Sequence, residues 1–201
     1  MNEIILASAS PRRRELLRNM GLDFSIIVSD ADEDSVDAGV PPEIYVQELA
    51  LLKATATAKR VLDRKDALII SADTIVVYDN KVLGKPKDEA QAKAMLKMLS
   101  GKIHQVYTGF CVLRMKDAMT VCKSVCTHVR FKNLTDEKIS GYVATKECMD
   151  KAGAYGIQGP FGAFVEKIEG DYNNVVGLPV SRLYRELCAM GIDLFKYSQE
   201  N

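Results

Sequence analysis

Hydrophobic residues along this chain form short continuous runs, and the stretches between the runs have helical periodicity. Runs of this kind predict buried strands, and their alternation with helical segments is typical of an α/β fold. The predicted strands span residues 4–7, 24–28, 67–77, about 103–115, about 119–131 and 164–168. Asp79-Asn80 has the composition of a hairpin turn, which would return the chain through Val82-Leu83.

Start and stop signals divide the intervening stretches into helices. The predicted helices span residues 11–20, about 42–62 and 88–99, with a short helix after Thr135 and a final one that ends near Gly191. The apolar face of the second helix is predicted to consist of Tyr45, Val46, Leu49, Leu52 and Ala56. Lys53 lies within about 40° of the centre of that face, so it either snorkels to solvent or meets a buried anion.

The first helix begins with a run of three arginines, Arg12 to Arg14, directly after Ser10-Pro11. Ser10 is a typical N-cap residue and Pro11 a typical first helical residue. Arginines in the first turn oppose the helix dipole, which favours acidic residues there. A bound anion, held by backbone N–H groups, the hydroxyls of Ser8 and Ser10 and the guanidinium groups, would compensate. A solvated basic helix start without a ligand is the alternative.

Helical spacing separates the three arginines. Arg13 lies on the same face as Leu16 and Leu17, whereas Arg12 and Arg14 lie about 100° to either side. We therefore expect Arg13 to point into the protein as the first anion ligand, with Arg12 flanking it and Arg14 in solvent.

Asp73 interrupts an apolar strand. Strand interiors are depleted in Asp, and a buried carboxylate needs a partner, so Asp73 is a candidate catalytic carboxylate. An Asp that caps a bulge or turn is the alternative. Glu33, in an acidic loop, could supply a second carboxylate to a metal–phosphate site, although such loops are usually only solvated. Pro86 keeps Lys85 extended, near the end of the hairpin that contains Asp73.

Composition limits the classes of function. The chain has 201 residues, 47% of them hydrophobic, which suits one medium α/β domain or two small lobes without a separating linker. Its net charge is zero, which disfavours binding to nucleic-acid polymers. No apolar run approaches the ~20 residues of a membrane span, and we expect no signal peptide before the first strand. The five cysteines show no CxxC pair and are expected to be reduced thiols of a cytosolic protein.

The polar residues together indicate phosphate chemistry. Arg13, Lys53 and Lys85 suit a polyphosphate, and Glu33 with Asp73 suits a divalent metal that bridges phosphates. The chain has no P-loop and no Gly-x-Gly-x-x-Gly after a strand, which disfavours P-loop NTPases and Rossmann dehydrogenases. Asp73 could deprotonate or orient a water, or hold the metal that does so; both roles stay open.

Six motifs resemble the Maf family of nucleotide pyrophosphatases, in the right order from about residue 3 to 190. They are Ser8-Ala-Ser-Pro-Arg-Arg13, Ser71-Ala-Asp-Thr74, Gly84-Lys-Pro86, His104-Gln-Val-Tyr-Thr-Gly109, Asp150-Lys-Ala-Gly-Ala-Tyr-Gly-Ile-Gln-Gly159 and Asn174-Val-Val-Gly-Leu-Pro179. The resemblance implies a single domain over residues 1–201. Its α/β fold would have an elongated mixed sheet and flanking helices in two lobes around a central cleft, like the inosine-triphosphate pyrophosphatases.

The resemblance also implies a reaction and a site. Members cleave nucleoside triphosphates between the α and β phosphates with Mg²⁺ or Mn²⁺, are cytoplasmic and are often homodimeric. Asp73 would be the proton acceptor, and Glu33 with Asp73 would hold the metal. The phosphate and metal site would be lined by Ser8, Arg12, Arg13, Glu33, Lys53 and Lys85.

Gly156-Ile-Gln-Gly159 resembles the branch of the family that acts on dTTP and UTP, in which Arg13, Thr74 and Gln158 match the positions linked to base choice. A glutamine amide can pair with the adjacent acceptor and donor of a pyrimidine edge. Two alternatives remain: a 7-methyl-GTP pyrophosphatase, and a nucleotide-binding regulator of septum formation that requires no turnover.

Overall fold

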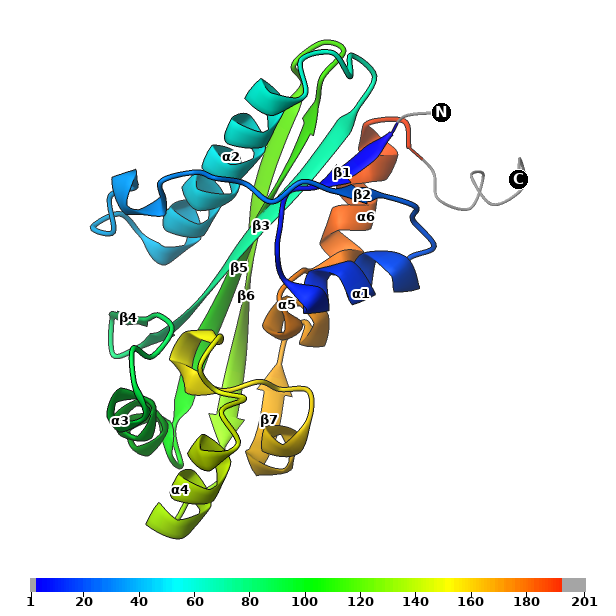
Figure 1. The fold of residues 1–201 in the computed structure, drawn as a ribbon. Helices are drawn as coiled ribbons and strands as arrows, with labels where there is room; N and C mark the ends of the chain where they lie inside the picture. Colours follow the sequence, from blue (N-terminus) through cyan, green and yellow to red (C-terminus); the bar gives the residue numbers. More distant parts are fainter. Residues whose placement is uncertain (1–2, 193–201) are drawn as a thin grey trace. The chain divides into compact units, whose positions relative to one another are not determined.

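The structure, a computed structural model, describes residues 3–192 and contains a seven-stranded sheet with helices beside it (Figure 1). The strand order is β2-β1-β3-β5-β6-β7, and β4 pairs with β3. The strands are β1 (Ile4–Leu6), β2 (Ser25–Ile26), β3 (Leu68–Tyr78), β4 (Lys81–Leu83), β5 (Ile103–Arg114), β6 (Thr120–Phe131) and β7 (Val165–Glu169). The helices are α1 (Pro11–Asn19), α2 (Pro42–Arg60), α3 (Glu89–Leu99), α4 (Asp136–Ala144), α5 (Tyr172–Val176) and α6 (Val180–Ala189). Three short 3₁₀ helices are η1 (Glu33–Ser35), η2 (Ala152–Ala154) and η3 (Pro160–Phe164).

The predicted α/β class with a mixed sheet is confirmed. β1 pairs in parallel with β2 and β3, whereas β4 pairs antiparallel with β3. The hairpin turn is also confirmed, because Asp79 and Asn80 both have positive φ, as a tight two-residue turn requires. The predicted strand at 24–28 is shorter than expected, Ser25–Ile26, and α5 was not predicted as a separate helix.

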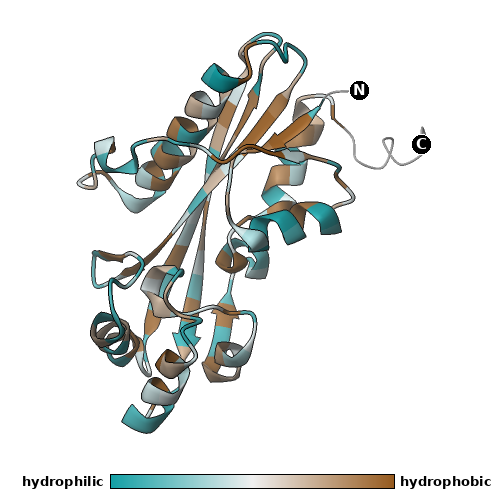
Figure 2. Ribbon diagram, in the orientation of Figure 1, coloured by the Kyte–Doolittle hydropathy of each residue, from teal (hydrophilic) through white to brown (hydrophobic). Residues whose placement is uncertain are grey.

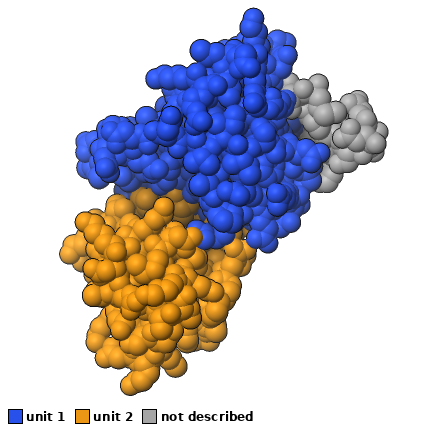
Figure 3. All heavy atoms as spheres, in the orientation of Figure 1, with its two compact units in different colours: residues 1–73, 108–125, 177–201 blue, residues 74–107, 126–176 orange. Residues whose placement is uncertain are grey.

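The chain divides into two compact units (Figure 3). The first unit comprises residues 1–73, 108–125 and 177–201, and the second comprises residues 74–107 and 126–176. Strands β3, β5 and β6 each contribute residues to both units. None of the helices within residues 3–192 combines the length and the apolar composition that a membrane span needs.

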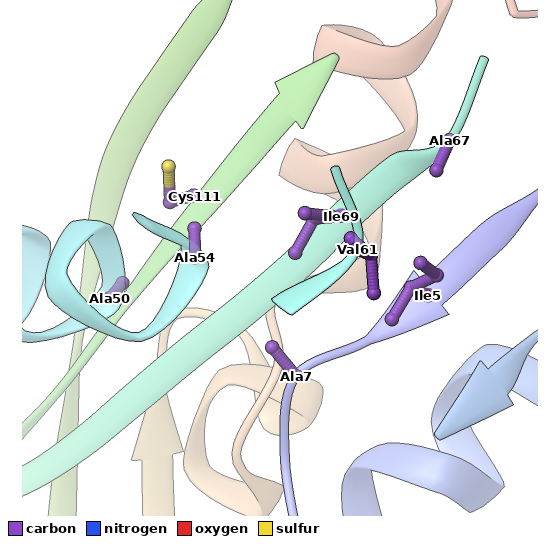
Figure 4. Close-up of a cluster of buried hydrophobic side chains, with 8 residues drawn as sticks. All are labelled: Ile5, Ala7, Ala50, Ala54, Val61, Ala67, Ile69 and Cys111. Carbon is purple, nitrogen blue, oxygen red and sulfur yellow. The ribbon is translucent and has the colours of Figure 1, made fainter. Parts of the chain in front are cut away.

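The core of the first unit forms where α2 packs on the sheet. β1 is buried at every position and is hydrophobic throughout, as Figure 2 shows. Small side chains dominate the contact with α2, so the helix backbone approaches the strands closely. One cluster of this core, drawn in Figure 4, consists of Ile5, Ala7, Ala50, Ala54, Val61, Ala67, Ile69 and Cys111.

The buried face of α2 is rotated about the helix axis relative to the predicted apolar face, so that prediction is wrong in part. The buried residues of the helix are Val46, Leu49, Ala50, Ala54 and Thr57. The larger residues of the predicted face, such as Tyr45 and Leu52, are only half-buried. The prediction gave weight to large apolar side chains. Alanines contribute little to an apolar pattern, but they allow the closest approach of the helix to the sheet.

An aromatic cluster forms the core of the second unit. His104 packs edge-to-face on Phe131 and Tyr155, with ring centroids 4.7 Å and 5.4 Å apart, and Phe131 also packs on Phe161. The ring nitrogen Nε2 of His104 lies 2.8 Å from the hydroxyl of Tyr155. Burial lowers the pKa of His104 to about 3 and raises that of Tyr155, so both groups are neutral near pH 7. These contacts give His104 a structural role in the core of the second unit.

The free energy of unfolding is expected to fall as the pH is lowered from about 6.5 toward about 3, because His104 binds a proton in this range only when the chain unfolds. The loss attributable to His104 approaches about 1.4 kcal/mol per pH unit within this window. Urea unfolding at several pH values should show a steeper loss for the wild type than for His104→Gln. The exposed His128 supplies the matched control, since His128→Gln should keep the wild-type slope. Equal slopes for wild type and His104→Gln would contradict the prediction.

Candidate active site

The turn between β1 and α1 supplies serine hydroxyls and the start of a helix. Ser10 is the N-cap residue and Pro11 the first helical residue, as predicted. The side chain of Ser10 makes no capping hydrogen bond, and the first turn holds no acidic residue. Instead, the backbone N–H of Ser10 donates to Ser8 Oγ at 3.2 Å. The N-terminus of α1 therefore lacks the usual side-chain cap, which is compatible with binding of an anion.

Arg13 points inward from α1, as its position on the helix predicts. Its Nη1 donates to Ser8 Oγ at 3.1 Å, and its Nε donates to the carbonyl of Gly177 at 2.8 Å. Burial lowers the pKa of Arg13, while the carboxylates of Asp73 and Glu33 act in the opposite direction. These hydrogen bonds help to fix the guanidinium, which lies in the field of both carboxylates.

The prediction that Arg14 lies in solvent is wrong. Its side chain is half-buried, and its Nη2 donates to the carbonyl of Ala9 at 2.9 Å. Arg14 therefore fixes the turn that precedes α1. Arg12, between the two, is also half-buried.

Lys53 holds two carboxylates together. Its Nζ lies 2.6 Å from Asp73 Oδ1 and 2.9 Å from Glu33 Oε2. The side chains of Lys53 and Asp73 are only 12% and 15% exposed, whereas that of Glu33 is 53% exposed. Of the two alternatives for Lys53, the buried anion is confirmed, and it is the carboxylate of Asp73. Because water screens this ion pair little, removing either member would leave the other charge without its partner in a shielded place, which is costly.

Tyr45 is a neighbour of the cluster of Lys53, Asp73 and Glu33. The sequence pattern places Tyr45 only on the apolar face predicted for α2. Its pKa is raised by partial burial and by the negative charges of Asp73, Glu33 and Asp34. Gly177 was also missed as a partner of Arg13. In both cases, the contact joins residues whose proximity depends on the tertiary fold.

The remaining predicted site residues, Thr74, Lys85 and Gln158, belong to the second unit. The backbone N–H of Gly153 donates to the carbonyl of Gly84 at 3.1 Å, so the glycine-rich loop that carries Gln158 is joined to the segment that carries Lys85. A Cβ atom at Gly153 would lie 2.9 Å from a methyl carbon of Val76, so only glycine permits this approach. Lys85 is exposed and Gln158 is half-buried.

The carboxylates suit a metal that is also bound by substrate. Residues 3–192 contain no group of three or more His, Cys, Asp or Glu side chains placed to hold a metal by themselves. Glu33 and Asp73, however, converge on one ammonium group, and Mg²⁺ is usually held by one or two carboxylates together with substrate phosphates. The donor set therefore fits a metal–phosphate complex better than a permanent metal centre.

The fold and the cluster define an α/β protein in which a helix start without a side-chain cap accompanies a lysine paired with two carboxylates. The chain belongs to the family described as Maf-like protein, whose model matches residues 3–190. It is 55% identical over 192 residues to a protein named dTTP/UTP pyrophosphatase from Clostridium novyi, covering 96% of this chain and 100% of the relative. Proteins with the same name from Clostridium botulinum and Bacillus cereus are each 50% identical over 194 residues, covering 96% of this chain and 100% and 98% of those relatives.

A solved structure from Mycobacterium abscessus, described as a nucleoside-triphosphatase and dITP/XTP pyrophosphatase, matches with a TM-score of 0.39 and 13% identity. The match covers 64% of this chain and 72% of that one.

Proposed function

We propose that this chain is a nucleoside triphosphate pyrophosphatase that hydrolyses dTTP and UTP to the monophosphate and pyrophosphate, and so removes unwanted pyrimidine nucleotides from the pool. The observation that carries the reaction is the cluster in which Lys53 pairs with Asp73 beside Arg13. The substrates are suggested by the names of relatives that match the chain over nearly their full length.

Each residue of the cluster has a chemical task in this proposal. The N-terminus of α1, with Ser8, Ser10, Arg12 and Arg13, binds the phosphates. Asp73 accepts a proton from the water whose oxygen attacks the α-phosphorus, and the bond from that phosphorus to the bridging oxygen breaks as pyrophosphate leaves. Lys53 orients the carboxylate of Asp73, since Nζ donates directly to Oδ1.

Glu33 and Asp73 would hold a divalent cation, Mg²⁺ or Mn²⁺, together with the substrate phosphates. Such a metal neutralises negative charge on the phosphates. The exposed carboxylate of Glu33 is accessible to a metal–nucleotide complex from solvent. We further propose that the protein acts in the cytoplasm as a homodimer.

The proposal is tested by a panel of substrates. Purified protein is incubated with dTTP, UTP, dCTP, dATP, GTP and 7-methyl-GTP, with Mg²⁺ and again with EDTA, while pyrophosphate and orthophosphate are measured separately. We expect pyrophosphate from dTTP and UTP in the presence of Mg²⁺. Preference for 7-methyl-GTP would place the chain in the branch of the family that acts on this nucleotide. Absence of turnover with every nucleotide would leave only the role of a nucleotide-binding regulator. Release of orthophosphate in place of pyrophosphate would contradict cleavage between the α and β phosphates.

Gln158 is proposed to select the base, together with Arg13 and Thr74. Gln158→Ala should lower kcat/KM for dTTP and UTP by about 10-fold or more, because a hydrogen-bonded edge of the base then has no partner. Steady-state kinetics on dTTP, UTP and dCTP measure the effect. Gln91→Ala, at an exposed position in α3, is the matched control and should leave kcat/KM for all three nucleotides unchanged. If Gln158→Ala kept the wild-type kcat/KM for dTTP and UTP, Gln158 would have no role in selecting the base.

A further inference from the structure

Cys111 on β5 and Cys122 on β6 stand directly opposite each other. The backbone N–H of Arg114 donates to the carbonyl of Met119 at 2.9 Å, next to the turn that joins the two strands. Counting three residues along each strand from this pair reaches Cys111 and Cys122. At the other end of the strands, the N–H of Phe131 donates to the carbonyl of Lys102 at 3.1 Å, which fits the same register.

The register also defines the type of pair. Hydrogen-bonded and non-hydrogen-bonded pairs alternate along antiparallel strands, so Cys111 and Cys122 form a non-hydrogen-bonded pair. The Cα atoms of such pairs are about 4.5 Å apart, within the range of about 4.4–6.8 Å that a disulfide spans. Both side chains point to the same face of the sheet, and a bond between them requires little movement of the backbone.

The two thiols already contact each other and differ in exposure. They are hydrogen-bonded to each other, and neither of them takes part in a disulfide. Cys111 is completely buried beside Ala50 and Ala54 of α2 (Figure 4). Cys122 is half-buried, so one member of the pair is accessible from solvent and the other is not.

We propose that Cys111 and Cys122 form a modification site, which a peroxide oxidises to a disulfide between β5 and β6. The pair lies wholly within the first unit. The proposal does not rest on the proposed hydrolysis of nucleotides.

Cys122 is the thiol that reacts first. Its pKa is lowered because Cys111 donates a hydrogen bond to its thiolate and Lys123 adds a positive charge, whereas the pKa of Cys111 is raised by the same bond and by burial. The Cys122 thiolate attacks one oxygen of hydrogen peroxide, which gives a sulfenic acid and hydroxide. The sulfur of Cys111 then displaces hydroxide from the Cys122 sulfur, and its proton converts hydroxide to water. The proton that Cys122 lost on forming the thiolate neutralises the hydroxide released from the peroxide, so in sum two thiols and one hydrogen peroxide give one disulfide and two waters.

The test is intact-mass and peptide mass spectrometry after treatment with hydrogen peroxide. Excess peroxide is removed, the protein is unfolded in an alkylating agent, and the alkylated thiols are counted. In the wild type we expect the count to fall from five to three, with a cross-linked peptide that joins Cys111 to Cys122 and is separated by dithiothreitol. This measurement requires no variant.

Variants assign the order of the steps. In Cys122→Ala no cross-link should form, and in Cys111→Ala the sulfenic acid should persist at Cys122 and react with dimedone. Cys126→Ala is the matched control, because this half-buried cysteine lies on the same strand and its loss should leave the cross-link intact. A wild type that keeps five thiols, a cross-link through Cys126 or Cys188, or oxidation of Cys122 to the sulfinic acid without a cross-link would overturn the proposal.

Discussion

Replacing Asp73 by Asn is expected to lower the rate of pyrophosphate release from dTTP by at least about 100-fold, since the amide cannot accept the proton of the attacking water. The substitution preserves shape, and the amide oxygen can still accept the hydrogen bond that Lys53 donates to Oδ1. Binding of the nucleotide should therefore be retained. Steady-state kinetics measure the loss, and calorimetry with a non-hydrolysable dTTP analogue measures binding.

Asp66→Asn provides the control for this substitution. Asp66 is an exposed carboxylate two residues before the start of β3, the strand that carries Asp73, so its loss changes the net charge equally. This variant should retain wild-type kcat and KM. Because the ion pair with Lys53 is shielded, urea unfolding must first show that Asp73→Asn is folded under the assay conditions. Full activity of a folded Asp73→Asn variant would refute the role of proton acceptor.

Local signals predicted much of the fold from sequence. Ser10-Pro11 marked the start of α1. The helix predicted over residues 88–99 begins where Asp88 accepts a capping hydrogen bond from the Gln91 N–H. Asp73 was found because a carboxylate in an apolar strand conflicts with its surroundings. In each case, the information lies within a few neighbouring residues.

Contacts between distant residues could not be predicted in this way. Arg13 donates to the carbonyl of Gly177, 164 residues away, and only the tertiary fold brings the two together. The pairing of Cys111 with Cys122 depends on where the turn between β5 and β6 falls, since a shift of one residue would send either thiol to the opposite face. The rotation of α2 likewise depends on how closely alanines can approach the sheet.

Gly109→Ala is expected to destabilise the protein by about 3 kcal/mol, at the upper end of the usual cost of overpacking. A Cβ atom at this position in β5 would lie 2.3 Å from the carbonyl oxygen of Val46 and 2.7 Å from the backbone nitrogen of Gln47. These atoms belong to the backbone of α2, so relief requires that the helix itself move. The midpoint of urea unfolding should fall accordingly.

Gly141→Ala is the matched control, because nothing lies within 4 Å of a Cβ atom there and the residue is inside α4. It should stabilise the protein by about 0.5–1 kcal/mol, since alanine favours helices over glycine. An unfolding midpoint of Gly109→Ala equal to that of the wild type would contradict the close approach of α2 to β5. Since α2 also carries Lys53, a shift of the helix should displace Nζ from Asp73. The activity of Gly109→Ala should therefore fall further than its folded fraction alone accounts for.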